Sequence, residues 1–402
     1  MKVNHHLKGK VVAAVDELLP QLNEIALAIY GHPELAFQEE FASALLTDRL
    51  AAAGFVVERG LAGLPTAFRA VMASPRGRDE PVQSHVHHRP VIAFLAEYDA
   101  LPGLGHACGH NLIAAAAAGA AMAAARILGD VDGVIQVIGT PAEEGGGGKI
   151  ILARQGVFEG VDAAMMVHPA DVNIAYTSSL ATQTVEMVFH GKASHAAASP
   201  GEGVSALAGV IETFNALNAL RLHLRSDVRL HGIITEGGTA VNIIPERAAA
   251  KFSVRALDHV YLEQVLGMVR DCADGAARAT RTTVDISFGE GYKELRINRT
   301  LADVFHHNLL NLGVPIAADE GGLGSTDMGD ISQVVPAIHP YVAAAPLGVA
   351  CHTKEFAALS GGPSGLAAVA VGAKAMAMTA TDLLIDGDLL GKVKKEFAAW
   401  RR

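Results

Sequence analysis

The first half of the chain alternates between helical and strand-like hydrophobic patterns. Apolar residues recur every three or four positions over 10–30, which predicts a helix with one buried face. A second helix is predicted over about 38–53, and an alanine-rich one over 111–128. Buried strands are predicted at three short apolar runs, Val91–Leu95, Gly133–Gly139 and Ala163–Val167. Strands that alternate with helices predict a three-layer α/β domain with a mostly parallel central sheet.

The pattern changes near residue 180. Thr184–Phe189 alternates between apolar and polar residues, as expected of a strand with one buried face. Next come a predicted helix at 203–224, strands near 228–234 and 247–256, a helix at 259–279 and a strand at 282–288. The order strand, helix, strand, strand, helix, strand is typical of a ferredoxin-like α+β domain.

This ferredoxin-like segment interrupts the first domain. From about residue 293 the chain returns to helices and strands, and it ends with helices predicted near 363–385 and 388–400. We therefore expect a first domain built from residues 1–180 and 293–402, with an inserted second domain of residues 181–292.

The composition is that of an ordinary globular protein. Of the 402 residues, 50% are hydrophobic and 18% are charged, which supplies ample material for two cores. Lys and Arg number 32 against 42 Asp and Glu, giving a formal net charge of −10. The sequence has no basic stripe, so a nucleic-acid partner is not expected.

Signals for a membrane or for secretion are weak. The most apolar long run, Leu112–Leu128, is mostly alanine and shorter than a membrane span, so we expect a buried helix and no membrane partner. The first residues lack the apolar centre of a signal peptide. Three cysteines are too few for a disulfide framework, which favours a reducing, cytoplasmic location. These features exclude a membrane channel, a disulfide-rich secreted protein, a fibre and a histone-like binder.

A dense cluster of reactive side chains follows the predicted strand Val91–Leu95. Glu97, Asp99, Cys108 and His110 lie between that strand and the alanine-rich helix. The cluster is therefore at the carboxyl end of a strand, where open α/β sheets bind ligands. A thiolate and an imidazole separated by one glycine are good ligands for zinc and related ions. A buried cysteine beside a helix-capping histidine is the alternative.

Three more positions at predicted strand ends carry metal-binding groups. Glu143 and Glu144 follow the strand Gly133–Gly139 and precede four glycines. Neighbouring strand residues point to opposite faces, so two glutamates that share one site must lie in the loop beyond the strand. Taken alone, the pair also fits an exposed acidic turn. His168 follows the next strand and His352 lies near the C-terminal end, and such repetition is hard to explain as packing.

With these motifs, the sequence resembles the dinuclear-metal amidohydrolases and exopeptidases that include aminoacylase, carnosinase and carboxypeptidase G. Within that family it is similar to the subgroup of aminobenzoyl-glutamate hydrolase and the auxin-conjugate hydrolases, which carry a Cys-Gly-His ligand motif. The resemblance runs from Gly31–Leu35 to Cys351–Phe356. Gly324–Gly329 departs from the auxin-conjugate branch and is closer to aminobenzoyl-glutamate hydrolase and the β-alanyl-lysine type of dipeptidase.

The resemblance implies a site for two divalent metal ions per subunit. The implied ligands are Cys108, which bridges both ions, His110, Glu144, His168 and His352. Glu143 matches the general base and Asp99 the acidic residue that orients a ligand histidine. Glu97 stands where other branches have a metal-binding histidine. The thiolate favours zinc, and manganese, cobalt and nickel stay open.

The resemblance also assigns roles to the inserted domain, as a lid and dimerisation domain. His195 lies in a motif whose histidine reaches the partner subunit's active site and polarises the scissile carbonyl, so a homodimer or larger assembly is expected. Asn242 matches an asparagine that contacts substrate. Arg255 matches an arginine that holds a substrate carboxylate. A charge on a strand surface is the alternative for Arg255.

The expected activity is metal-dependent hydrolysis of the amide bond of an N-acyl amino acid or a dipeptide-like small molecule. A carbamoyl-amide hydrolase on the same scaffold is one alternative. A catalytically silent relative that binds a ligand is a second, although it predicts loss of Glu143 or of a ligand. A thiol protein that uses Cys108 is a third, although the sequence places no resolving cysteine nearby.

Some residues have no assigned role. Cys272 is predicted to pack in a helix core, whereas Cys351 either packs or touches a metal ligand. His85, His87 and His88 lie in a polar loop over 74–90, where a solvated surface is expected and a metal role is the alternative.

Overall fold

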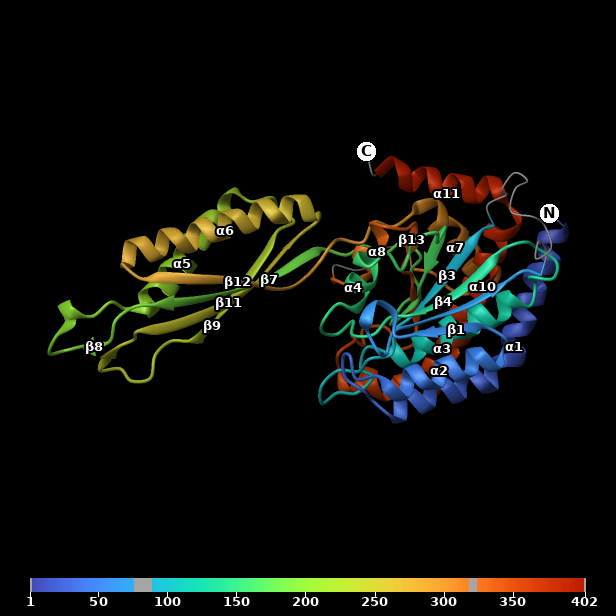
Figure 1. Ribbon diagram of the computed structural model, residues 1–402, viewed down its shortest axis with the longest axis horizontal. Coiled ribbons are helices and arrows are strands. Elements are labelled where there is room, and N and C mark those ends of the chain that lie inside the picture. Colours follow the sequence, from blue (N-terminus) through green and yellow to red (C-terminus); the bar gives the residue numbers. More distant parts are fainter. Residues whose placement is uncertain (1, 76–88, 318–323, 401–402) are drawn as a thin grey trace. The chain divides into compact units, whose positions relative to one another are not determined.

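The computed structural model describes residues 2–75, 89–317 and 324–400 (Figure 1). His85, His87 and His88 lie outside the described residues. The chain folds into two compact units. The first unit is Met1–Ser178, Leu295–Gly322 and Asp330–Arg402, and the second is Ser179–Glu294 with Leu323–Gly329.

The first unit is built around a six-stranded mixed sheet. Its strands lie in the order β1 (Val56–Arg59), β2 (Phe68–Ala73), β4 (Val134–Gly139), β3 (Val91–Ala96), β5 (Ala163–Met165) and β13 (Ala337–Ile338). The central strand β3 pairs in parallel with β4 and β5, and β5 pairs in parallel with β13. The strands β1 and β2 add an antiparallel edge. The expected α/β domain with a mostly parallel sheet is confirmed.

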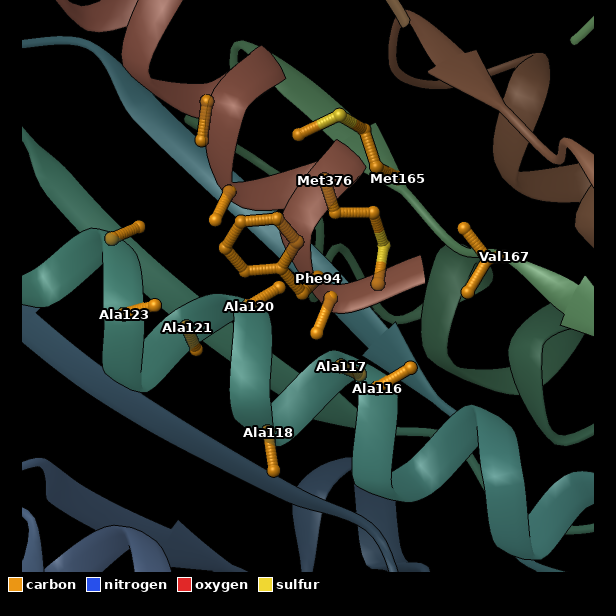
Figure 2. Packing of buried hydrophobic residues seen from close by; sticks show 14 of the residues in the cluster. Phe94, Ala116, Ala117, Ala118, Ala120, Ala121, Ala123, Met165, Val167 and Met376 are labelled. Atoms are coloured by element: carbon orange, nitrogen blue, oxygen red, sulfur yellow. The ribbon is translucent and has the colours of Figure 1, made fainter. Parts of the chain in front are cut away.

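Helices surround this sheet. They are α1 (Lys2–Gly31), α2 (Glu40–Ala52), α3 (His110–Ala125), α4 (Gly148–Arg154), α7 (Arg299–Asn311), α8 (Met328–Ser332), α9 (Lys354–Ser360), α10 (Pro363–Ile385) and α11 (Gly387–Trp400). The alanine-rich helix α3 packs against α1 and α10, and its residues from His110 to Ala124 are all buried. Figure 2 shows its alanines beside Phe94 of β3, Met165 of β5 and Met376 of α10. Small side chains therefore let three core helices approach closely.

The helix α10 passes a test of length and apolar composition for a membrane span. Of its most apolar stretch, 78% is buried inside the protein. That burial is what a core helix of a folded domain shows, so the hydropathy of α10 is explained by packing.

A short parallel pair continues the first sheet towards the functional residues. It consists of β6 (His168–Ala170) and β14 (Tyr341–Ala343). The predicted strand at 163–167 forms as β5, which ends at Met165, and β6 begins after a two-residue break, with His168 at its first position.

The second unit has a four-stranded antiparallel sheet in the order β12-β7-β11-β9. Its elements follow the chain as β7 (Ala181–His190), α5 (Ala206–Leu220), β9 (Arg229–Glu236), β11 (Arg247–Ala256), α6 (His259–Thr280) and β12 (Thr283–Tyr292). Along β7, Val185, Met187 and Phe189 are buried against the two helices, which lie side by side on one face of the sheet (Figure 1). The expected ferredoxin-like order is confirmed.

Two smaller features complete the second unit. A ribbon of β8 (Ser194–His195) and β10 (Ile243–Ile244) extends beyond the end of the sheet. The segment around Gly324 and Ser325 joins this unit as well, because the backbone N–H of Leu180 donates to the Gly324 carbonyl at 2.9 Å and the Ser325 hydroxyl donates to the Leu180 carbonyl at 2.9 Å. Short 3-10 turns lie at Pro200–Glu202 and Arg221–His223 of this unit and at Leu61–Gly63 of the first unit.

Candidate active site

The carboxyl ends of β3, β4 and β5 bring the candidate residues of the first unit together. Because these strands are parallel neighbours, the segments that follow them meet at one edge of the sheet. Glu97 and Asp99 follow β3, Glu143 and Glu144 follow β4, and His168 follows β5.

Two of the groups of potential metal ligands at this edge share the Cys108 sulfur. The first group is Cys108, His110 and His168, and the second is Cys108, Glu144 and His352. Within each group, one donor atom from each residue lies within 4.8 Å of the others. The Cys108 Sγ is 3.3 Å from Nε2 of both His168 and His352. One thiolate can therefore face two ions.

The donor atoms fit divalent metal ions. Two donors that bind one tetrahedral ion at about 2.0–2.3 Å lie roughly 3.3–3.7 Å apart. The 3.3 Å separation between His352 Nε2 and Glu144 Oε1 matches that spacing. His110 Nε2 is buried and has no hydrogen-bond partner among the described residues. Nitrogen, oxygen and sulfur donors in this arrangement suit zinc and similar ions.

The second nitrogen of each buried histidine is held by another group, which fixes the ring. His110 Nδ1 donates to the Asp99 carboxylate at 2.9 Å, and His168 Nδ1 donates to the Pro169 carbonyl at 2.7 Å. Such contacts leave Nε2 facing the metal site. Asp99 is itself buried, and its other oxygen accepts from the Glu144 backbone N–H at 2.9 Å. Asp99 thus connects the two ligand groups.

Backbone geometry explains the glycine between Cys108 and His110. Gly109 precedes α3 with φ +77°, in the left-handed region that favours glycine. A Cβ atom there would lie 2.9 Å from the Pro169 ring. His352 also has a positive φ, of +65°, and its N–H donates to the Ala107 carbonyl at 2.9 Å. This bond holds the C-terminal ligand beside the Cys108 segment.

Glu143 lies beside these ligands without belonging to either group that contains Cys108. One of its carboxylate oxygens is within 4.8 Å of a His110 nitrogen and a Glu144 oxygen. Both glutamates lie in a loop beyond β4, where Ala142 has φ +62° and its carbonyl accepts from the Gly147 N–H at 2.9 Å. The turn lets adjacent glutamates face one site.

Burial and nearby carboxylates change the acidity of the donors. Burial lowers the pKa of His110, but the Glu97 and Asp99 carboxylates outweigh it and raise that pKa well above its ordinary value. The hydrogen bond with Cys351, together with burial, raises the pKa of the Cys108 thiol well above its ordinary value. Both groups release a proton when they bind a metal ion.

Three further side chains at the site carried no role in the sequence. Lys149 is fully buried and its Nζ donates to Glu97 Oε1 at 2.5 Å, which neutralises a carboxylate whose Oε2 is 3.4 Å from His110 Nε2. His339 is buried with its ring 5.3 Å from that of His168, edge to face. The pair His339-Pro340 repeats the pattern of His168-Pro169, which is a signal the sequence offered.

The third is Cys351, which precedes the ligand His352. Its thiol is half-buried and donates to the Pro169 carbonyl at 3.7 Å. A hydrogen bond with Cys108 lowers the pKa of the Cys351 thiol. Cys351 therefore both packs and touches a proposed ligand. Cys272 packs against the core of the second unit, as its position in a predicted helix suggested.

In the second unit, the structure brings His195 and Asn242 together. The exposed His195 lies in β8 opposite Ile243 of β10, and the Asn242 carbonyl accepts from the Ala196 N–H at 2.9 Å. His195 Nδ1 accepts from the backbone N–H groups of Ala197 and Ala198 at 3.2 and 3.1 Å. Its proton therefore resides on Nε2, which is the tautomer required to donate to a carbonyl.

Arg255 lies elsewhere in this unit. It sits near the end of β11, opposite Thr182 of β7, and it is half-buried on the face of the sheet away from the helices. Arg255 lies eight residues along β11 from Arg247. At about 3.3 Å per residue, the two positions are roughly 26 Å apart. Asn242 lies beyond Arg247 along the chain. Within one protomer, Asn242 and Arg255 are therefore too far apart to hold the same carboxylate.

Comparisons with known proteins agree on one family. The family model described as the peptidase dimerisation domain matches residues 179–281. The Xaa-Arg dipeptidase of mouse is 40% identical over 97% of this chain and 92% of its own length. One of the p-aminobenzoyl-glutamate hydrolase polypeptides of Escherichia coli is 30% identical over 95% of this chain and 93% of its own length.

A solved structure supports the fold. The crystal structure of a dinuclear metal-binding peptidase of the M20 family from Bacillus subtilis superposes with a TM-score of 0.71 at 20% identity, covering 92% of this chain and 99% of that one. Because it is 30–40% identical to these relatives over nearly their full length, this chain belongs to the M20 family of peptidases.

Proposed function

We propose that the protein is a two-metal hydrolase that cleaves the amide bond of a dipeptide or an N-acyl amino acid. The observation that carries this proposal is the pair of ligand groups that share Cys108, with Glu143 beside them. A silent, ligand-binding relative is disfavoured because every ligand and the base are present. When bound, the two ions supply Lewis-acid polarisation of the carbonyl and lower the pKa of water to about 7.

Glu143 acts as the general base. Its carboxylate faces the shared edge of both ligand groups, so it can take the proton of the attacking water and return it to the departing amine. Glu144, one residue away, serves as a ligand, and Asp99 holds His110 in the orientation that faces the metal site. The two neighbouring glutamates thus divide proton transfer and metal binding between them.

His195 stabilises the oxyanion that forms at the scissile carbonyl. Its two hydrogen bonds from backbone N–H groups fix the proton on Nε2, and the side chain is exposed. We assign this donor, with Asn242, to the active site of the partner subunit of a homodimer. Arg255, at the other end of the sheet, holds a substrate carboxylate. The separation along β11 supports contributions from different protomers.

The substrate class follows from these groups and from the relatives. A carboxylate-binding arginine fits a dipeptide or an acyl amino acid. The relative named Xaa-Arg dipeptidase makes dipeptides with a cationic C-terminal residue the first candidates. Aminobenzoyl-glutamate is the second, because a relative over nearly the full length is named for it. A carbamoyl-amide substrate would use the same ligands and a different pocket.

The identity of the metal ion and the location of the protein are also proposed. Zinc is the proposed ion because a thiolate faces both ligand groups, with manganese, cobalt and nickel as the competing ions. The three cysteines are unpaired, which supports a reducing, cytoplasmic location.

The test is a substrate panel. Metal-depleted protein is loaded with Zn²⁺, Mn²⁺, Co²⁺ or Ni²⁺ and assayed on Xaa-Arg and β-alanyl-lysine dipeptides, aminobenzoyl-glutamate, N-acetyl amino acids and an N-carbamoyl amino acid. We expect hydrolysis that chelator abolishes and that Glu143→Gln removes. Bound metal without turnover of any substrate would contradict this substrate class. Failure to bind metal would contradict the ligand set.

A further inference from the structure

The segment from Gly31 to Glu39 begins with the family motif Gly31–Leu35 but has no role in the chemistry above. It connects α1 to α2 and ends at Glu39, a carboxylate with 0% exposure. A buried carboxylate is retained only where donors satisfy it. The partners of Glu39 therefore show what this segment does.

Glu39 accepts three hydrogen bonds, and one comes from the catalytic loop. Its Oε1 accepts from the backbone N–H groups of Phe37 and Ala142, each at 2.9 Å. Its Oε2 accepts from the Thr66 hydroxyl at 2.8 Å. Ala142 directly precedes Glu143, so the segment before α2 holds the loop that carries both functional glutamates.

The loop that carries Glu143 and Glu144 has a strained backbone, which contacts such as those of Glu39 stabilise. Ala142 has φ +62°, a conformation that residues with a Cβ atom rarely adopt and that costs about 1 kcal/mol or more. A second contact comes from Phe37, whose ring fills the space where a Cβ of Gly146 would lie, only 2.3 Å away. Thus the segment touches the loop on both sides of the glutamates.

A matching contact lies on the other side of Glu143. The Glu144 backbone N–H donates to Asp99 Oδ2 at 2.9 Å. The two residues that flank Glu143 therefore each donate their backbone N–H to a buried carboxylate, Ala142 to Glu39 and Glu144 to Asp99. Asp99 also orients His110, whereas none of the three groups that donate to Glu39 belongs to a proposed metal ligand.

We propose that Glu39 is a positioning residue for the hydrolysis: by accepting the Ala142 N–H, it holds Glu143 in the orientation for proton transfer. The inference rests on the proposed function of Glu143. What matters is an acceptor oxygen at the correct distance, because both amide donors converge on Oε1. The negative charge is not required for either bond.

The variants of Glu39 are chosen to separate the effect of its acceptor oxygen from the effect of its negative charge. Glu39→Gln keeps an acceptor oxygen for both amides, and its NH₂ can donate to the Thr66 hydroxyl, which is able to accept. Glu39→Asp keeps the charge but is shorter by one methylene, so it cannot reach Ala142 while bound to Phe37. Glu39→Met keeps the length and has no strong acceptor.

Glu34 provides the matched control. Its carboxylate also accepts two hydrogen bonds from backbone N–H groups, those of Phe41 at 2.8 Å and Ala42 at 2.9 Å. Both donors belong to the first turn of α2. Glu34→Met therefore removes the same number of backbone bonds from the same segment without touching the catalytic loop. We expect it to lower the melting temperature and to leave kcat unchanged.

The experiment measures kcat, KM, bound metal and amide exchange of the peptide 141–147 in each zinc-loaded variant. Misplacement of a catalytic group typically lowers turnover about 10²-fold, and we expect this loss in Glu39→Met and Glu39→Asp with KM and metal content unchanged. Exchange at Ala142 should accelerate in both. Glu39→Gln should stay close to the unchanged protein in every measurement.

Two results would overturn the proposal. One is a Glu39→Met protein that folds and keeps its kcat and slow exchange. The other is a Glu39→Gln protein with lower kcat than Glu39→Asp, which would show that the charge matters and not the acceptor. The comparison of Glu39→Gln with Glu39→Asp tests the proposal even if Glu39→Met does not fold. Because amide exchange needs no turnover, it reports on the Glu39 contact even if the substrate class is wrong.

Discussion

The adjacent residues Glu143 and Glu144 have different proposed roles, general base and metal ligand, although they lie in the same turn. Both are glutamates in one loop, yet Glu144 lies with Cys108 and His352 while Glu143 lies outside both groups that contain the thiol. Glu39 and Asp99 accept hydrogen bonds from the backbone N–H groups of Ala142 and Glu144, the residues on either side of Glu143. These two contacts hold the backbone on both sides of Glu143, which supports the proposed division of roles.

This difference predicts opposite effects for two isosteric variants. Glu143→Gln removes the proton acceptor and should lower kcat by about 10²–10⁴-fold while both metal ions stay bound. Glu144→Gln weakens one ligand group, so the bound metal should fall below two ions per subunit. Metal content by elemental mass spectrometry, measured with kcat on the same samples, checks both. Equal metal loss in the two variants would contradict the division of roles.

Metal uptake should depend on pH in a defined direction. The pKa of His110 is raised by Glu97 and Asp99 against the effect of burial, and the pKa of the Cys108 thiol is raised by Cys351 and by burial. Both groups therefore hold their protons more tightly than usual in the metal-free protein, and each loses a proton on binding. Apparent affinity should rise as pH increases from 6 to 8. Calorimetry in buffers of different ionisation enthalpy measures the released protons, and a pH-independent affinity would contradict the shifts.

The residues that sequence could identify were those with a distinctive neighbourhood. Cys108-Gly109-His110 and the glutamate pair before four glycines stand out because few structural roles need them. Glu39 and Lys149 could not be found this way, since a single charged residue in a helix or turn is usually exposed. Only the structure shows that Glu39 and Lys149 are buried, and that each has a partner far away in sequence.

At the scale of helices and strands, the spacing of hydrophobic residues predicted the elements that are regular and buried. The helices α1, α3, α6 and α10 and the strands β3, β4, β7 and β11 match the predicted segments to within a few residues, apart from longer ends at α1 and β7. The strand β1 was not predicted because it is only four residues long and mostly exposed, so it shows no apolar run. Its partner β2 follows a short loop and was not predicted either.

Close packing of α3 makes a specific stability prediction. A Cβ at Gly119 would lie 2.5 Å from the Leu22 side chain of α1 and 3.3 Å from Ala373 of α10. Leu22 is fully buried and cannot move away freely. Gly119→Val should therefore lower the free energy of unfolding by about 1–3 kcal/mol.

The matched control is Gly9→Val in the exposed part of α1, where nothing lies within 4 Å of the added Cβ. That change should stay within about 0.5 kcal/mol of the unchanged protein. Chemical denaturation of both variants provides the comparison. Equal stability of the two would show that α1 and α10 can move apart around α3.

At the scale of the whole molecule, the proposed active site needs two copies of the chain. Each protomer carries its own Glu143 and ligand groups in the first unit, and His195 with Asn242 in the second. The roughly 26 Å of strand β11 between Arg255 and the end nearest Asn242 places these substrate contacts at opposite ends of one sheet. In the proposed two-fold symmetric dimer, Arg255 from one protomer's sheet and the Asn242 end of the partner's sheet contribute to the same substrate.

Mixing two inactive variants tests this arrangement. A heterodimer of Glu143→Gln and His195→Ala subunits has one site that combines an intact Glu143 with an intact His195 from the partner. If subunits exchange at random, half of the dimers are of this kind, so about one quarter of the full activity should return. The mixture is unfolded and refolded together, or the two chains are co-expressed, and kcat is compared with each variant alone. Recovery requires His195 to act across the subunit boundary, because a histidine that serves its own chain leaves both sites of the heterodimer defective.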